Sequence, residues 1–186
     1  MKYYRLIYKE TNKELILVNN YDIKGLDLRK LWRGESIDKW DESIRLTYSK
    51  KGIAVDYLPN VLSWLIFSDK AVKVFKDMSI KNIQMFPVNI TKGLKNEEVL
   101  KYNVVNILTS IPALNREKSD YAIWEDSLEE IKFIRKAVLN KVMINEDIDI
   151  FLLKEGVVYV IVSERLKKQL EINDITGVDF EELETI

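Results

Sequence analysis

Two stretches of the chain show the same order of apolar and polar positions. The first opens with residues 64–70 (WLIFSDK) and the second with residues 159–165 (YVIVSER). In each, a short apolar run predicts a strand, and the Ser that follows is a preferred helix N-cap worth about 1 kcal/mol. Asp69 and Glu164 come next, where a negative charge favours the positive end of the helix dipole. Each stretch therefore predicts a strand that leads into a capped helix.

The agreement continues beyond the two caps. Apolar residues return first at helical spacing and then in strand-like alternation: Ala71, Phe75 and Met78, then Ile83, Met85 and Val88 in the first stretch, and Leu166 and Leu170, then Val178, Phe180 and Leu183 in the second. Two interpretations stay open, an internal duplication of a strand-helix-strand unit at 58–88 and 153–183, or a chance likeness of two ordinary units. Both interpretations describe scaffold rather than a site.

The remaining pattern predicts a strand-rich chain. Strands are expected at 2–9, 14–18, 44–48, 102–108, 121–124 and 147–153, the first two as a hairpin, and a short helix at 26–32 that stops before Gly34. Residues 127–142 fit a helix through Ile131, Ile134 and Val138, and fit a strand through Phe133. We expect an α+β fold with a mixed or antiparallel sheet and two or three short helices. The 186 residues suit one domain, 1–186, with a subdivision into 1–100 and 101–186 left open.

Composition excludes several kinds of site. The chain has no Cys and no His, which rules out disulfides, thiolate or imidazole metal ligands and a His general base. No apolar run approaches the ~20 residues of a membrane span, and the N-terminus has no secretory hydrophobic segment, so we expect a cytoplasmic protein without membrane contact. A net charge of −1 argues against nucleic acid as a partner.

Motifs for catalysis or cofactor binding are weak. No Gly-rich phosphate loop occurs, and Ser68 and Ser163 are better explained as helix caps than as nucleophiles. Lys70 and Lys73 follow Ser68, which keeps a Ser-Lys enzyme as an alternative. Asp147 with Asp149, or Glu181 with Glu182, supply too few oxygen ligands for a metal site. We therefore predict no catalytic residue, no cofactor and no metal site, with a carboxylate- or Ser/Lys-dependent enzyme and a non-enzymatic scaffold or oligomer subunit as the alternatives.

The C-terminal stretch has the one charge pattern that suggests a partner. Six acidic residues follow one another there without a Lys or Arg between them: Glu171, Asp174, Asp179, Glu181, Glu182 and Glu184. Such carboxylates can steer a basic protein partner and raise its association rate. We predict these six as candidate partner-binding residues, beside the simpler interpretation of a solvated strand face.

The order of several motifs resembles a bacterial family, immunity family eleven of the polymorphic toxin systems, once catalogued as a domain of unknown function. The motifs are DYLPN at 56–60, IFSDK at 66–70, VNIL at 105–108, SDY at 119–121, IFLLK at 150–154, VSERL at 162–166 and ITGVDF at 175–180. Ser63 and Asn115 depart from the residues expected there, Gly and Asp. The resemblance implies a binding protein that neutralises a cognate toxin domain, with no catalytic residue and no cofactor.

Overall fold

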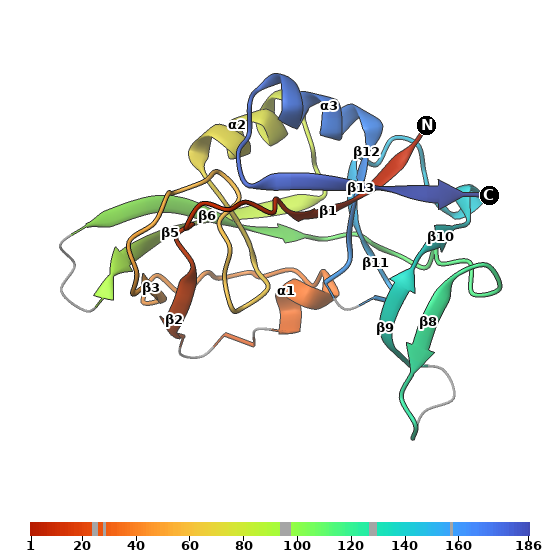
Figure 1. Cartoon of the computed structure of the whole chain (residues 1–186), viewed down its shortest axis with the longest axis horizontal. Helices are drawn as coiled ribbons and strands as arrows, with labels where there is room; N and C mark the ends of the chain where they lie inside the picture. Colours follow the sequence, from red (N-terminus) through yellow and green to blue (C-terminus); the bar gives the residue numbers. More distant parts are fainter. Residues whose placement is uncertain (24–25, 28, 94–97, 127–129, 157) are drawn as a thin grey trace.

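The structure is a computed structural model that describes residues 1–23, 26–27, 29–93, 98–126, 130–156 and 158–186. Within these residues the chain forms two larger β-sheets, a two-stranded sheet and the helices α1 (Arg29–Arg33), α2 (Asp69–Asp77) and α3 (Glu164–Ile172). Figure 1 shows α2 and α3 together over the sheet that contains β1 and β13, with α1 on the opposite side. The predicted strand-rich α+β class is confirmed.

The six-stranded sheet joins the two ends of the chain. In sheet order its strands are β10 (Val138–Leu139), β13 (Val178–Thr185), β1 (Tyr3–Tyr8), β12 (Val160–Ser163), β11 (Ile150–Leu153) and β7 (Ser110–Ile111). β1 pairs antiparallel with both β12 and β13, whereas β10 pairs parallel with β13 and β7 with β11. The N-terminal strand therefore lies inside a sheet that is otherwise built from the second half of the chain.

The five-stranded sheet comes mostly from the first half. Its order is β2 (Val18–Asp22), β3 (Arg45–Tyr48), β5 (Ile83–Lys92), β6 (Val99–Ile107) and β4 (Leu65–Phe67). β3 pairs parallel with β5, and the other neighbours are antiparallel. The remaining elements are β8 (Asp120–Ile123), β9 (Ile131–Lys136) and the short 3-10 helix η2 (Lys141–Met143). β8 and β9 form a hairpin that extends away from both sheets (Figure 1).

The predicted N-terminal hairpin is wrong. β1 pairs with β12 and β13, and of residues 14–18 only Val18 belongs to a strand, the first residue of β2, which pairs with β3. Tyr3, Tyr4 and Leu6 are all buried, so both faces of β1 are covered. A strand with two buried faces is stabilised at the centre of a sheet, and this long-range pairing prevails over the short turn.

The ambiguous segment 127–142 forms no α-helix where the structure describes it. Residues 131–136 form β9, 138–139 form β10, and η2 follows, while 127–129 lie outside the described residues. β9 pairs with β8, and β10 pairs with β13. The backbone hydrogen bonds of these pairs outweigh the helix propensity of the segment. The short helix predicted at 26–32 appears as α1 and ends before Gly34, whose φ is +69°, although Leu28 is not described.

The two predicted strand-helix-strand units share one topology. β4 and β5 flank β6, and β12 and β13 flank β1, in each case antiparallel to the strand between them. Both helices are capped as predicted, because Ser68 accepts a hydrogen bond from the amide of Ala71 and Ser163 from that of Leu166. This shared arrangement explains the repeated sequence pattern and leaves its evolutionary origin open.

A single hydrophobic cluster holds the two helices against both sheets. It contains Phe75 of α2, Leu166 of α3, Tyr4 of β1 and Phe67 of β4, all buried. Burying apolar surface contributes roughly 25 cal/mol per Å², so this shared core fixes α2 and α3 beside each other. Their outer surfaces form the site described next.

Candidate functional site

Each helix cap is anchored by an aspartate from an earlier segment. The hydroxyl of Ser68 donates to Asp56 Oδ1 at 2.5 Å, and the hydroxyl of Ser163 donates to Asp149 Oδ1. The backbone amides of the same serines donate to the carbonyls of the same aspartates, at 2.8 and 2.9 Å. The sequence predicted the two caps but not the aspartates that anchor them. Each aspartate lies well before its serine along the chain, and the two meet only when their segments pack together.

Asp56 also ties the first unit to the second. Its Oδ2 accepts hydrogen bonds from the amide of Thr176 at 2.8 Å and from the hydroxyl of Thr176 at 2.7 Å. Partial burial raises the pKa of Asp56, but the hydrogen bonds from Ser68 and Thr176 prevail, and its pKa lies below the usual aspartate value. Asp56 therefore stays ionised and joins α2 to the turn after α3.

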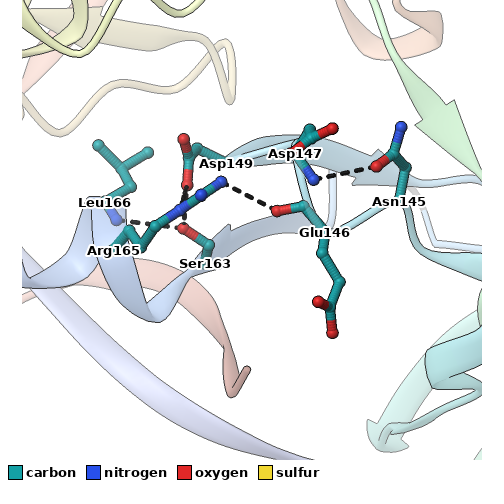
Figure 2. A network of polar contacts seen from close by, with 7 residues as sticks. All are labelled: Asn145, Glu146, Asp147, Asp149, Ser163, Arg165 and Leu166. Atoms are coloured by element: carbon teal, nitrogen blue, oxygen red, sulfur yellow. Dashed lines mark hydrogen bonds and ion pairs between the residues drawn. The ribbon is translucent and has the colours of Figure 1, made fainter.

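Asp149 instead fixes a surface arginine. Figure 2 shows Arg165 Nε donating to Asp149 Oδ1, at 3.1 Å, and Arg165 Nη2 donating to the carbonyl oxygen of Glu146, at 2.9 Å. The amide of Asp147 donates to Asn145 Oδ1 at 3.0 Å, which shapes the turn before β11. The network holds the turn at 145–149 against the first turn of α3.

A groove of about 750 Å³ lies between α2, α3 and this turn. We call it the α2–α3 groove, and its lining residues include Val74, Asp77, Met78, Asp147, Arg165, Lys168 and Ile172. Ile172 is 72% exposed although it is a large aliphatic residue. The groove thus combines apolar surface with carboxylates and two basic side chains.

The comparison with known protein families identifies the class of protein. A family model described as Immunity protein family (Imm11) matches residues 6–185. The chain belongs to this immunity protein family. The match confirms the resemblance seen in the sequence motifs, and membership implies neutralisation of a cognate toxin by a protein of a typically non-enzymatic class. A comparison with curated proteins finds no match.

The geometry around Ser68 in the immunity protein does not bring a lysine to its hydroxyl. Lys70 Nζ donates to the carbonyl oxygen of Asp174 at 2.6 Å, and Lys73 Nζ donates to Asp77 at 2.5 Å. The Ser68 hydroxyl donates to Asp56 while it caps α2. Ser68 is therefore explained by helix capping, Lys70 by a hydrogen bond to a backbone carbonyl and Lys73 by a surface ion pair with Asp77.

Across the part of the chain that the structure describes, no group of three or more His, Cys, Asp and Glu side chains is placed to hold a metal ion. No helix in the same residues is both long enough and apolar enough to cross a membrane.

The six predicted C-terminal carboxylates occupy several surfaces. Glu171 is on α3, Asp174 follows it in the turn, and the other four are on β13. Because side chains alternate along a strand, Asp179 and Glu181 lie on one face of β13, and Glu182 and Glu184 on the other. The structure therefore does not gather the six residues into one patch.

Four of the six carboxylates form ion pairs with neighbouring bases. These are Glu171 with Lys167 at 2.6 Å, Glu181 with Arg5 at 3.5 Å, Glu182 with Lys2 at 2.7 Å and Glu184 with Lys136 at 3.0 Å. All four carboxylates are about half exposed, so each pair is solvated and worth little in stability. The surface around β13 is consequently of mixed charge. The sequence could not show this mixing, because Lys2, Arg5 and Lys136 come from segments distant along the chain.

The β8–β9 hairpin presents a further surface that sequence reasoning missed. Trp124 and Phe133 are each 46% exposed, with Lys132 Nζ lying 4.7 Å from the Trp124 ring centroid and Arg135 Cζ 5.1 Å from that of Phe133. Aromatic and arginine side chains are frequent anchors of protein interfaces. The exposure of Trp124 contrasts with Trp64, which is buried in the core. Local sequence does not distinguish the two tryptophans, because each is next to one aliphatic residue, Leu65 or Ile123.

Proposed function

We propose that the immunity protein acts in the cytoplasm, where it binds its cognate toxin domain and covers the surface that the toxin needs for its activity. The observation that carries this proposal is the α2–α3 groove, where the exposed Ile172 lies among charged side chains. The two helices that form the groove are held in place by a shared hydrophobic core. Family membership supports a toxin as the partner.

Occlusion requires only part of the molecular surface. A stable interface buries about 800 Å² per partner, which is less than a tenth of the 10928 Å² that the chain exposes. The face formed by α2, α3 and the turn at 145–149 can therefore be the centre of such an interface. The rigid helices reduce the entropy lost when the partner binds.

The test is a titration of toxin activity with the immunity protein, using the toxin domain that co-purifies with it. Occlusion predicts that inhibition is complete at a molar ratio near one and that the released toxin regains full activity. Inhibition at a small fraction of that ratio, with a chemically altered toxin, would instead support the alternative of an enzyme. An immunity protein that leaves toxin activity unchanged at all ratios would favour the scaffold or oligomer alternative.

We also propose that the C-terminal carboxylates, although they lie on several surfaces, help to steer the toxin toward the immunity protein. Replacing Asp179, Glu181 and Glu182 with Lys reverses the charge of that strand, and we expect the association rate to fall about tenfold at low ionic strength, with the difference shrinking as salt is added. Stopped-flow association across a salt series measures this effect. The matched control reverses three exposed acids distant from β13 in the sequence, through Glu14→Lys, Asp38→Lys and Glu42→Lys. Equal rates in wild type and the β13 variant would remove these residues from the interface.

A further inference from the structure

We propose that the α2–α3 groove holds an extended segment of the toxin domain in which a Lys or Arg lies beside a large aliphatic side chain. This inference rests on the proposed function, and it names the part of the toxin that the immunity protein recognises. It is carried by the exposed apolar residue in the groove, by the unbalanced negative charge of the groove and by its size.

Ile172 supplies the apolar contact. It is the last residue of α3, and its 72% exposure differs from that of Leu166 and Leu170, the fully buried apolar residues of the same helix. Met78, the residue that caps the end of α2, is partly buried and also lines the groove. An aliphatic side chain of the partner can pack against Ile172 and Met78 and remove apolar surface from water on both molecules.

The ion pairs leave negative charge in the groove. Arg165 is neutralised by Asp149, whose side chain is only 13% exposed, and Lys168 pairs with Glu164 at 3.0 Å. Asp147 also lines the groove, and the part of the chain that the structure describes provides it with no ion pair. The groove therefore favours a cation near Asp147.

Asp77 adds to this negative potential from α2. Its ion pair with Lys73 is weak, because the two side chains are 62% and 74% exposed. Asp77 is the last residue of α2, where the negative end of the helix dipole also attracts a cation. A Lys or Arg of the partner can thus bind between carboxylates on two sides of the groove.

The size of the groove fits a short piece of chain. Its volume of about 750 Å³ is within the range of ligand pockets, roughly 300–1,000 Å³. That space accommodates one basic and one aliphatic side chain with the backbone between them. The walls are fixed before binding, since the Ser163 cap and the Asp149–Arg165 contact hold α3 to the turn at 145–149 (Figure 2).

The experiment compares groove variants with matched surface variants of the full-length protein. Ile172→Lys and Asp147→Lys change the two features that the proposal uses. Val142→Lys and Asp38→Lys place the same charge at an exposed aliphatic residue and an exposed carboxylate outside the groove. Calorimetry with the co-purified toxin domain gives each Kd, and circular dichroism verifies that every variant is folded.

Each groove variant should weaken binding at least about tenfold, while each control stays within about twofold of wild type. Overlapping 12-residue peptides that tile the toxin domain should include one basic and aliphatic peptide that binds wild type and not Asp147→Lys. Tight toxin binding by both groove variants would overturn this inference and leave occlusion standing. If no toxin domain co-purifies with the wild-type protein, the proposed function is overturned, and with it this inference.

Discussion

At the scale of single residues, the most consequential side chain is the carboxylate of Asp56. It accepts the Ser68 hydroxyl at the start of α2 and both hydrogen-bond donors of Thr176. Hydrogen bonds to a charged group contribute about 1.5–3 kcal/mol each when well formed, and less when partly solvated. One residue thus stabilises a helix start and a contact between distant segments.

We expect Asp56→Ala to lower the free energy of unfolding by about 2 kcal/mol, because it removes these acceptors and leaves the donors of Ser68 and Thr176 unsatisfied. Urea unfolding at pH 7 measures the loss. Asp38→Ala, at an exposed carboxylate, should change stability by less than about 0.5 kcal/mol. A loss of similar size in both variants would contradict the role given to Asp56.

The stability difference between wild type and Asp56→Ala should also depend on pH. The pKa of Asp56 in the folded protein lies below its unfolded value of about 3.9. Its contribution is therefore complete above the unfolded pKa and is lost as the pH falls through the folded pKa. Unfolding experiments from pH 6 down to the lowest pH at which the protein folds should show the two stabilities converging.

At the scale of elements, the turn between α3 and β13 determines how closely the two strand-helix-strand units approach. Gly177 has a φ of +82°, and a Cβ at this position would lie 2.6 Å from the carbonyl oxygen of Tyr57. The amide of Lys9 donates to the carbonyl of Gly177, and that of Tyr57 to the carbonyl of Thr176. The turn is therefore in contact with the first unit and with the end of β1.

Gly177→Ala should lower the free energy of unfolding by at least about 2 kcal/mol, because the added methyl group clashes with its neighbours and the backbone conformation disfavours alanine. Gly93 provides the control, since its φ is +59° but nothing lies within 4 Å of an added Cβ. Gly93→Ala should therefore lower the free energy of unfolding by about 1–2 kcal/mol, which is the penalty for an alanine at positive φ. Thermal unfolding measures the stability of both variants. An equal loss of stability would mean that the close approach of Tyr57 leaves room for a side chain at position 177.

At the scale of the whole molecule, the sheet that contains β1 binds the two ends of the chain together. β1 lies between β12 and β13, and its residues Tyr3 and Tyr4 contribute to different hydrophobic clusters. Removing this strand would expose the backbone of both neighbours and apolar surface on both faces of the sheet.

A variant that begins at residue 9 should therefore show no cooperative unfolding transition in urea. A synthetic peptide of residues 1–9 added to it should restore the transition, because the peptide can pair with β12 and β13. Cooperative unfolding of the truncated chain without the peptide would show that β1 is dispensable to the fold.

The local features of this protein follow from short stretches of its amino-acid sequence. The two apolar runs with Ser68 and Ser163 predicted the capped helices, because a cap needs only residues within one turn. The ordered motifs also identified the family. Long-range packing was needed to pair β1 with β12 and β13, to make residues 131–136 a strand, and to bring Arg5 to Glu181 and Lys2 to Glu182. It alone placed Asp147, Asp77 and Ile172 around one groove. These outcomes depend on which distant segments pack together, and that choice is made by the free energy of the whole core.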